Sequence, residues 1–597
     1  MRCLEICVCR NCKETHCESA WQSCRLSGVA TTMSPCSEEL VCRFNNDDGI
    51  HAALDKNTTS STSIADLSED IFLLVLRDLS AWDLVSCQRV CSSWRSAFSR
   101  EGYIRLVLQN YPRTREIRSL PRSALNFNSS FRPSSLGWQE LLLLIATRYR
   151  NLSRGTARQV LRYPMAPLEQ HGDWYSVGQW EYHESQPGGR LYYETAAIHL
   201  SKLGAKPYLF RPTMWSYDDG LLVYAPSSRC LGDKGYFPET LSLLDLSTGR
   251  QCPVPFSNEG KIIRNLRLKD RTLIIEWAEK DPFHNLNAME QVNRHFANCF
   301  DVRRRGGGGD DDHEPWEVCW RSEWKMHFLG LPPNYHDRFF STHDSTHYAV
   351  YFWQPNRSMY TGDEELPIES LSVWDISRRS PYRPSTDPSG RFRPPDHHRR
   401  RDGPRVVSRF SFTDMDFVGV RQHASIALMS LRVDSGTRSL TVRENVNVAG
   451  QGYFDPAERL WCARTTTFPF EGQGPRLYRE WDGNLPPYRG HCSMESADVE
   501  ESERWFLPVM DVVDADAGVR MSLVETCFSG QSVENRLVVR LKVTGAADTT
   551  TAAAAVDEWV TLEDQLAAEV SAMGRIAGDE RWLVGQNDRM EIVVLKF

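Results

Sequence analysis

The sequence has 597 residues, of which 41% are hydrophobic and 25% are charged, and its formal net charge is −8. This length predicts more than one domain, and the composition is typical of a globular protein. The negative net charge does not indicate a nucleic-acid-binding protein, and no transmembrane helix is expected because no run of 18 apolar residues occurs.

A cysteine-rich stretch opens the chain, since eight of its 17 cysteines fall within the first 42 residues. Zinc sites usually combine two close pairs of Cys or His ligands, but only one pair here is well spaced. The weak candidate ligands are Cys9, Cys12, His16 and Cys17. The alternatives are a disordered tail, or a stretch outside the natural protein if translation starts at Met33. We expect a disordered tail and linker over residues 1–62, with no bound metal and no cofactor.

The N-terminal region also bears on the cellular compartment. It has no continuous apolar stretch of the kind that a secretory signal requires. Cysteines of proteins that are not secreted are normally reduced. We therefore expect a cytoplasmic or nuclear protein, or one present in both compartments, with free thiols.

The segment from Leu67 to Ser96 is the most informative, because its first helix would be apolar nearly all the way round. Six apolar residues follow one another from Ile71 to Leu76. A helix of a small domain normally needs one apolar stripe, and a large exposed apolar surface usually marks a protein interface. The pattern predicts a helix with one side in its own core and the other side against a partner protein.

Local signals predict three short helices in this segment. Acidic residues at 69 and 70 and a basic residue at 77 match the dipole of the first helix. Ser80 and Asp83 have the spacing of a capping box that opens the second helix. Ser92 or Ser93 can cap the third helix, and apolar residues continue at helical spacing to Phe98.

The residue pattern of this segment resembles an F-box, the module by which substrate receptors join a ubiquitin ligase. The matching positions are Leu67, Glu69, Ile71, Phe72, Leu79, Asp83, Leu84, Val90, Cys91, Trp94 and Arg95. Ser68 stands where the family has proline. Since either residue can begin a helix, this difference leaves the resemblance intact.

The resemblance implies an F-box over residues 63–110 that binds a Skp-type adaptor and, through it, cullin and RING subunits. The residues implied to form the surface or the core of the adaptor-binding site are Leu67, Ile71, Leu74, Val75, Leu79, Leu84, Val90 and Trp94. The protein is then expected to be a non-catalytic substrate receptor of a Skp–cullin–F-box (SCF) ubiquitin ligase. It would recruit a protein substrate, in unmodified or phosphorylated form, and no nucleic acid or membrane.

Residues 111–165 are predicted to be a linker that contains one helix, over 136–151. Trp138, Leu141, Leu142, Ile145 and Tyr149 recur at helical spacing. Many F-box proteins carry a similar helix between the box and a propeller. Periodicity and resemblance therefore predict the same element.

The remaining residues, 166–597, are predicted to be all-β and to bind the substrate through residues that the sequence leaves unknown. Short runs rich in β-branched and aromatic residues alternate there with Gly, Pro, Asp and Asn. These runs lie at 220–226, 240–246, 265–278, 347–353, 370–377, 424–433, 536–543 and 591–597. The fold class is thus α+β multidomain, with a small three-helix F-box, a linker helix and a large all-β domain.

A partial repeat predicts the architecture of the all-β domain. Residues 241–255 and 371–385 share the pattern Leu-Ser-x-x-Asp-x-Ser, in which the Asp can cap the following turn. Trp374 and Asp375 form the dipeptide of WD-repeat blades. We predict a degenerate β-propeller of six to eight blades, similar to fungal F-box substrate receptors. Disordered insertions are expected near 303–314, which combines glycines with opposed charges, near 378–409, where apolar residues are scarce, and near 544–558, which is of low complexity.

Two other functions stay open. One is an F-box protein that acts with the adaptor outside a ligase, which cullin co-purification would distinguish. The other is a propeller hydrolase or lyase whose N-terminal helices form an interaction element. This enzyme would need clustered carboxylates or metal ligands at one end of the propeller channel. The sequence contains no phosphate-binding glycine loop and no nucleophile elbow.

Overall fold

The computed structural model describes residues 67–597, except for 113, 128, 130, 132–136, 167–213, 228–240, 286–290, 306–314, 327–337, 355–366, 388–390, 392–402, 424–427, 448–460, 472–476, 482–503, 515–516, 529–535, 544–558 and 573–574. The chain divides into a unit of residues 1–62 and a unit of residues 63–597. The four candidate zinc ligands and the insertion predicted near 544–558 lie outside the described residues, as does most of the insertion near 303–314.

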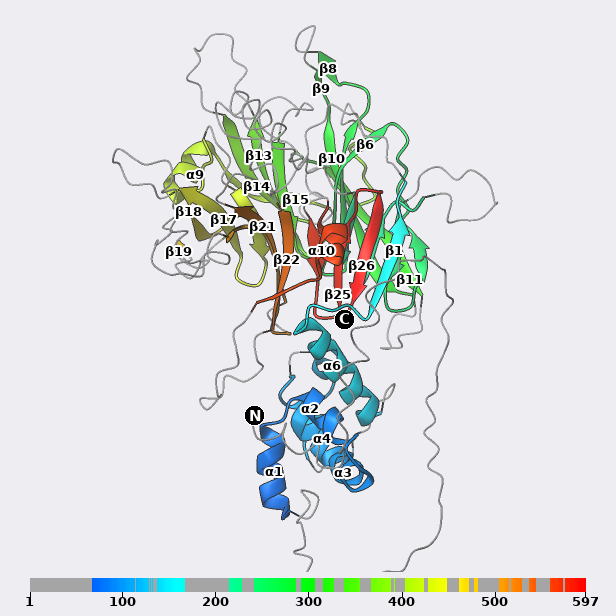
Figure 1. Cartoon of the computed structure of the whole chain (residues 1–597). Helices are drawn as coiled ribbons and strands as arrows, with labels where there is room; N and C mark the ends of the chain where they lie inside the picture. Colours follow the sequence, from blue (N-terminus) through cyan, green and yellow to red (C-terminus); the bar gives the residue numbers. More distant parts are fainter. Residues whose placement is uncertain are drawn as a thin grey trace, which may run out of the picture. The chain divides into compact units, whose positions relative to one another are not determined.

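The N-terminal part of the described chain is helical (Figure 1). Its elements are α1 (Glu69–Arg77), α2 (Ala81–Cys87), α3 (Ser92–Phe98), α4 (Glu101–Leu108), α5 (Arg115–Arg118), η2 (Arg122–Leu125) and α6 (Trp138–Leu152). One hydrophobic core joins them, with Phe72, Leu84, Phe98, Ile104 and Leu142 among its buried members. The helix predicted over 136–151 is α6, and it packs in the same core as the three predicted F-box helices. No helix of the described residues is long and apolar enough to cross a membrane.

The C-terminal part is a six-bladed β-propeller, within the six to eight blades that the sequence predicts. In the described residues it consists of six four-stranded antiparallel sheets. Blade 1 contains β2 (Trp215–Asp218), β3 (Leu221–Tyr224), β4 (Ser242–Asp245) and β5 (Gln251–Pro253). Blade 2 contains β6 (Lys261–Lys269), β7 (Thr272–Glu279), β10 (His295–Arg304) and β11 (Trp316–Lys325). Blade 3 contains β12 (Arg338–His343), β13 (His347–Gln354), β14 (Ile368–Asp375) and β15 (Arg405–Phe410).

The second half of the ring is built in the same way. Blade 4 contains β16 (Leu428–Asp434), β17 (Ser439–Asn447), β18 (Trp461–Pro469) and β19 (Tyr478–Trp481). Blade 5 contains β20 (Arg504–Asp514), β21 (Val519–Phe528), β22 (Arg536–Val543) and β23 (Val560–Thr561). Blade 6 contains β24 (Ile576–Gly578), β25 (Trp582–Gln586), β26 (Glu591–Lys596) and β1 (Gln159–Pro164). The short strands β8 (His284–Asn285) and β9 (Gln291–Val292) form a separate hairpin, and α9 (Phe412–Val418) and α10 (Asp564–Ser571) connect blades.

Blade 6 closes the ring with strands from distant parts of the chain. Its sheet order is β1-β26-β25-β24, and β1 pairs antiparallel with β26 from Gln159 opposite Lys596 to Pro164 opposite Glu591. The propeller therefore begins at residue 159, inside the segment that the sequence predicts to be a linker over 111–165. The signal for β1 is weak because its side chains are exposed or half-buried, without the alternation of a half-buried strand.

A second difference concerns the insertion predicted to be disordered near 378–409. Arg405–Phe410 is strand β15, the outermost strand of blade 3, which pairs with β14. Ser380 and Ser385 also have fixed partners, because their amides donate to the Arg321 carbonyl (2.9 Å) and to Glu323 Oε1 (2.9 Å). Hydrogen bonds thus order parts of a segment that contains few apolar residues.

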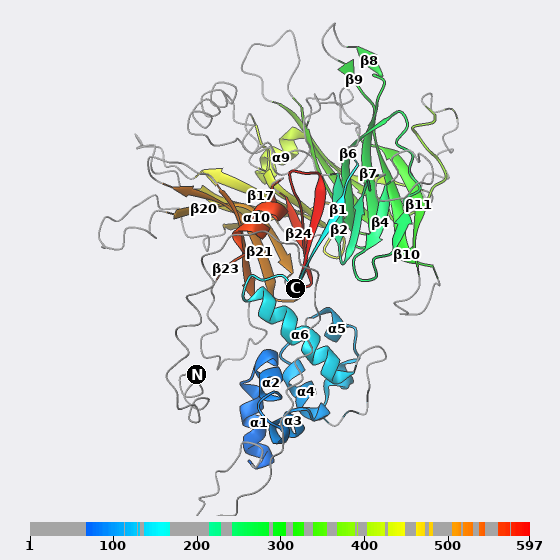
Figure 2. The same ribbon diagram turned by 45° about the vertical axis from the view of Figure 1, so that its right-hand side comes forward.

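The strand order determines which loops share an end of the ring (Figure 2). The first strands of neighbouring blades contact one another, as β2 does with β6 and β24, so each blade begins at its inner strand. Because neighbouring strands are antiparallel, the turns between first and second strands all emerge at one end. We call this end the helix-side face, since Asp219 and Ala517 in two of these turns contact the helical part. The opposite end is the distal face.

Candidate adaptor-binding surface

Helix α1 has one buried side and one exposed apolar side. Phe72 and Leu76 lie in the helical core, with 4% and 0% of their surface exposed. Phe72 packs against Phe98 and Tyr103, with ring centroids 4.9 and 5.0 Å away. On the other side, Ile71 and Leu74 are 50% and 61% exposed. The six-residue apolar run thus divides between a core and an open surface, as the sequence predicts.

Helix α2 is fixed by the predicted capping box. The Asp83 amide donates to Ser80 Oγ (3.1 Å), and the Ser80 amide donates to Asp83 Oδ2 (3.1 Å). The phenol of Tyr111 accepts a hydrogen bond from the Ala81 amide (3.2 Å). Leu84 on this helix is fully buried. Leu84 therefore belongs to the core of the F-box rather than to its surface.

Helix α3 begins at Ser92 with Cys91 as its N-cap residue, so the predicted cap at Ser92 or Ser93 is wrong. Cys91 makes no side-chain capping hydrogen bond to the helix backbone. Trp94 packs on Phe98 with ring centroids 5.5 Å apart. Val90, in the turn before the helix, is 60% exposed.

The structure separates the eight predicted adaptor-binding residues into three groups. The exposed residues are Ile71, Leu74 and Val90; the half-buried residues are Leu67, Val75, Leu79 and Trp94; the buried residue is Leu84. Exposed side chains can contact an adaptor directly. Leu84 can act only by holding the helices together, so it belongs to the core of the predicted adaptor-binding site and not to its surface.

Comparison with protein families agrees with this geometry. Residues 64–105 match the family model of the F-box domain. The helical segment is an F-box domain. A search of curated proteins finds no match to the chain. The F-box domain is followed along the chain by the propeller.

Replacing the buried Leu84 with alanine tests the division into surface and core. We expect this change to destabilise the F-box by about 2–5 kcal/mol, because it opens a cavity in a packed core. The control change, Leu74→Ala, removes an exposed side chain and should alter stability by less than about 0.5 kcal/mol. Thermal melting followed by circular dichroism measures both changes. Equal melting temperatures would contradict the assignment of Leu84 to the core.

Helix α6 connects the F-box to the propeller. Leu141 and Ile145 lie in the helical core, whereas Leu152 at its C-terminal end is fully buried among residues of blades 5 and 6. The phenol of Tyr149 donates to the Ala517 carbonyl (2.7 Å) in the β20–β21 turn. Beyond the helix, Gly155 has φ +63°, and a Cβ there would lie 2.6 Å from the Thr561 carbonyl oxygen. The chain is therefore in close contact with blade 5 at this joint.

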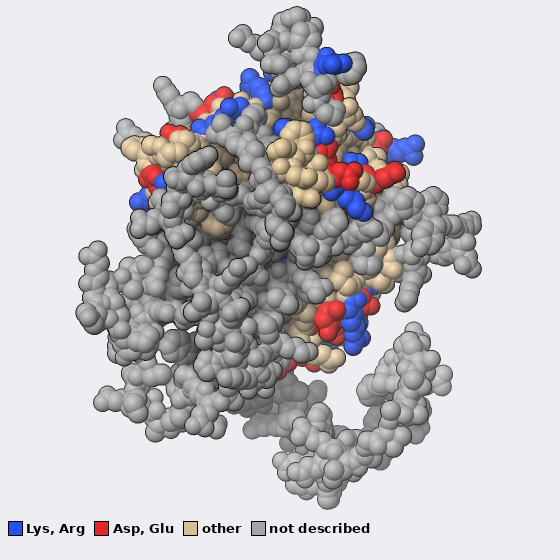
Figure 3. Space-filling view, turned by 90° about the horizontal axis from the view of Figure 1, so that it is seen from above, with Lys and Arg blue, Asp and Glu red and all other residues tan. Residues whose placement is uncertain are grey.

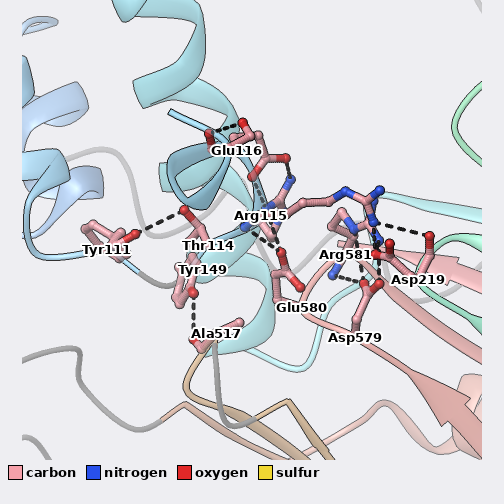
Figure 4. Close-up of polar contacts among 12 residues, drawn as sticks. Tyr111, Thr114, Arg115, Glu116, Tyr149, Asp219, Ala517, Asp579, Glu580 and Arg581 are labelled. Atoms are coloured by element: carbon pink, nitrogen blue, oxygen red, sulfur yellow. Dashed lines mark hydrogen bonds and ion pairs between the residues drawn. The ribbon is translucent and has the colours of Figure 1, made fainter. Parts of the chain in front are cut away.

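Buried charges reinforce the connection (Figure 4). The Arg148 guanidinium of α6 donates to both carboxylate oxygens of Glu116 on α5, at 2.9 and 2.6 Å. It also lies 3.6 Å from Glu580 of the β24–β25 turn, which accepts a hydrogen bond from the Arg115 amide (3.2 Å). Arg148 and Glu580 have side chains that are only 4% and 1% exposed. Helical and propeller charges thus neutralise one another inside the interface.

A second group of charges lies beside the first. The Arg115 guanidinium pairs with Asp219 in the β2–β3 turn. Arg581 bridges Asp219 (3.1 Å) and Asp579 (2.6 Å), and Asp579 also accepts a hydrogen bond from Tyr217 (2.7 Å). Burial would raise the pKa of Asp579, but the nearby Arg581 charge lowers it below the ordinary value. Blades 1 and 6 are therefore both tied to α5.

None of the charged residues at this joint is predicted from the sequence. Glu580 is separated from Arg115 by 465 positions, so no local spacing can reveal the contact. One signal exists within α6, because Arg148 follows Leu141 by seven residues and therefore lies on the same buried face. A charge on an apolar helix face indicates a buried partner, although it does not identify that partner.

The acidic partner in this joint should make the interface sensitive to acid. Burial alone would raise the pKa of Glu116, but the hydrogen bonds and charge of Arg148 lower it below 4.5. The ion pair between Glu116 and Arg148 therefore stabilises the folded protein fully above the pKa that Glu116 has in the unfolded chain. This stabilisation is lost as the pH falls through the lower pKa that Glu116 has in the folded protein. At neutral pH, we expect the melting temperature of the wild type to be higher than that of the Glu116→Gln variant. This difference in melting temperature should shrink below about pH 4.5. A difference that is constant with pH would contradict this role.

The distal face carries the loops farthest from the F-box. Figure 3 shows that the described basic and acidic side chains are interspersed there, without a large area of one sign. Helix α9 connects the last strand of blade 3 to the first strand of blade 4 on this face, and its Phe417 is 85% exposed. Among the described residues, charge therefore does not mark a substrate-binding site on this face.

A polar cavity of about 500 Å³ lies between blades 3 and 4 on the helix-side face. Its arginines are paired, Arg405 with Asp375 (3.3 Å) and Arg438 with Glu471 (3.6 Å). His347 Nδ1 lies 2.7 Å from Ser435 Oγ. Over the described residues, no group of three His, Cys, Asp or Glu side chains is placed to hold a metal ion.

Proposed function

We propose that this chain is the substrate-recognition subunit of an SCF-type ubiquitin ligase. The observation that carries the proposal is the division of α1 in the F-box domain. Phe72 and Leu76 complete the core, while Ile71 and Leu74 remain exposed. Apolar side chains in this state gain free energy by binding a partner. The partner that an F-box implies is a Skp-type adaptor, which connects the chain to cullin and RING subunits.

In this function the chain contributes no reacting group. It raises the effective concentration of a substrate lysine near the activated ubiquitin. A stiff connection between the adaptor and substrate sites favours this task, because a flexible one would spread the lysine over a larger volume. The shared core of α6 and the Arg148–Glu116–Glu580 group support such a connection.

The propeller is proposed to bind the substrate, in the cytoplasm, the nucleus or both. Binding residues of proteins commonly lie on loops that a rigid scaffold holds in place. Loops of the distal face emerge away from the F-box, so a substrate there would not compete with the adaptor. A phosphorylated substrate would be recognised by arginine side chains that bind phosphate in bidentate fashion.

Reconstitution tests the proposal against its alternative outside a ligase. The purified chain is mixed with a Skp-type adaptor, cullin and RING subunit and analysed by size-exclusion chromatography. We expect all four proteins to elute together. If the adaptor co-elutes but the cullin is excluded, the chain acts with the adaptor alone. If the adaptor does not bind either, the proposed function is wrong.

A further inference from the structure

A basic surface lies on the helical part of the chain, where α2 packs beside α6 (Figures 1 and 2). Gln88 just after α2 hydrogen-bonds Gln139 near the start of α6 (2.5 Å). Trp82 near the start of α2 contacts Arg150 near the end of α6, so the two helices run in opposite directions. We call this surface the α2–α6 patch. Its side chains come from both helices and from the turns that follow them: Trp82, Arg89, Leu143, Arg150 and Arg154.

Two of the arginines gather around the Trp82 ring. The guanidinium carbon of Arg150 lies 3.6 Å from the centre of this ring, and that of Arg89 lies 5.7 Å from it. A guanidinium group that stacks on an aromatic ring keeps the N–H groups at its edge available for a carboxylate. Arg150 and Trp82 are half-buried, and Arg89 is exposed. The α2–α6 patch therefore combines oriented cationic donors with a partly exposed aromatic surface.

No acidic side chain of the described residues neutralises these arginines. Partial burial lowers the pKa of Arg150, and the neighbouring charges of Arg154 and Arg89 lower it further, whereas no carboxylate raises it. Neither Arg89 nor Arg154 makes an ion pair within the described part of the chain. The exposed Asp78, which precedes α2, is not among the charges that act on Arg150. Like charges at close range repel one another, so a bound anion would stabilise this group.

The acidic residues of α2 and α6 are engaged at the starts of their own helices. Each helix contains one, Asp83 in α2 and Glu140 in α6. Asp83 accepts a hydrogen bond from the Ser80 amide (3.1 Å), and Glu140 accepts one from the Gly137 amide (3.1 Å). Both carboxylates are thus held by backbone amides, and neither is among the charges that act on Arg150.

The α2–α6 patch adjoins the surface that is implied to bind the adaptor. Val90, an implied adaptor contact that is 60% exposed, directly follows Arg89. Leu143 is 44% exposed and lies about two helical turns before Arg150 on the same side of α6. Arg89 falls within the matched residues 64–105, whereas α6 lies outside them. Tryptophan and arginine are enriched at protein interfaces, so the patch has the composition of an interface that extends beyond the F-box.

We propose that the α2–α6 patch binds an acidic segment of the Skp-type adaptor, with carboxylates beside the arginines and an apolar side chain against Trp82 and Leu143. Complementary charges at the edge of an interface mainly raise the association rate. A protein segment fits better than nucleic acid because the patch includes the exposed apolar Leu143 and the chain has a net charge of −8. This inference rests on the proposed ligase function and adds a charged contact to the apolar contact at Ile71 and Leu74.

Binding of a purified Skp-type adaptor to the full chain tests the proposal, with affinity measured by titration calorimetry and association by stopped flow. Both are measured at about 0.1 M and about 1 M salt. The variant Arg89→Glu/Arg150→Glu/Arg154→Glu should bind at least about tenfold more weakly at the lower salt concentration, chiefly because association is slower. This difference should largely disappear at the higher salt concentration, because the Debye length falls from about 10 Å to about 3 Å. A loss of binding through misfolding would not depend on salt in this way.

Matched variants separate the patch from net charge and from folding. Arg250→Glu/Arg303→Glu/Arg432→Glu makes the same charge change at exposed arginines of the propeller and should bind the adaptor like wild type. Replacing the three patch arginines with lysine keeps their charges and should give tighter binding than the glutamate variant at the lower salt concentration. Circular dichroism checks that each variant is folded. If the glutamate variant fails to fold, glutamine at the same three positions replaces it, with weaker binding again expected.

The outcomes separate this inference from the proposed function. If the wild type does not bind the adaptor at either salt concentration, both are wrong. If the wild type binds but the glutamate variant matches it, or loses the same affinity at both salt concentrations, only the assignment of the patch is wrong. An equal loss in the propeller control would also overturn the assignment, because the effect would then come from net charge. Tighter binding of a single-stranded RNA oligomer than of the adaptor, through the same three arginines, would overturn it as well.

Discussion

Replacing Ile71 and Leu74 with aspartate is expected to lower the affinity for a Skp-type adaptor at least about 100-fold. The two side chains are 50% and 61% exposed in the free chain. Fully burying an exposed apolar side chain of this size contributes about 1.5–3 kcal/mol. Since about half of each residue is already buried, the two together would contribute roughly 1.5–3 kcal/mol. An aspartate in the same position would also have to lose its hydration in the complex. Isothermal titration of the purified proteins measures the loss.

The structure provides a matched control for this experiment. Ile368 and Phe417 are apolar residues of the propeller that are 47% and 85% exposed. Ile368→Asp/Phe417→Asp introduces the same charges outside the F-box and should leave adaptor affinity unchanged. The Ile71→Asp/Leu74→Asp variant should melt like wild type because Phe72 and Leu76 remain in the core. Unchanged affinity in this folded variant would show that α1 is not the contact surface.

Replacing Arg148 with alanine is expected to loosen the joint between the F-box and the propeller. Removing one partner from a buried ion pair typically costs about 3–5 kcal/mol, because the remaining charge stays buried and uncompensated. Here Glu116 and Glu580 would both lose the Arg148 charge. Hydrogen exchange should then become faster in α5 and in the C-terminal half of α6, with little change in blades 2 and 3.

Two further variants distinguish a charge effect from lost packing. Arg154→Ala removes an exposed arginine just after α6 and should leave hydrogen exchange unchanged. In the double variant Glu116→Ala/Arg148→Ala, the loss of stability should be smaller than the sum of the two single losses, because the residues interact directly. Additive losses, or unchanged exchange in Arg148→Ala, would contradict a joint held by these charges.

Local signals account for what the sequence predicts well. The capping box at Ser80 and Asp83 and the helical spacing through α6 identify the helices without knowledge of the fold. The Asp of each repeated propeller segment caps a turn as predicted, since Asp245 accepts from the Ser247 amide (2.8 Å) and Asp375 from the Ser377 amide (3.0 Å). Each of these interactions lies within a few residues along the chain.

Contacts between distant positions account for what the sequence does not predict. A run of six apolar residues does not reveal that Phe72 is buried while Ile71 is exposed, because this depends on where α3 and α4 pack. Strand β1 has no clear periodicity of its own and is defined by its pairing with β26. The charges at the joint are likewise brought together only by the complete ring.

The division of labour between the F-box and the propeller is tested most directly by affinity purification with quantitative mass spectrometry. Wild type and Ile71→Asp/Leu74→Asp are purified in parallel from the same cells. We expect the adaptor, cullin and RING subunits to be lost together from the variant, while proteins bound by the propeller are retained. If the ligase subunits stay bound to the folded variant, or the other partners disappear with them, the F-box surface and the substrate site are not separate and the account is wrong.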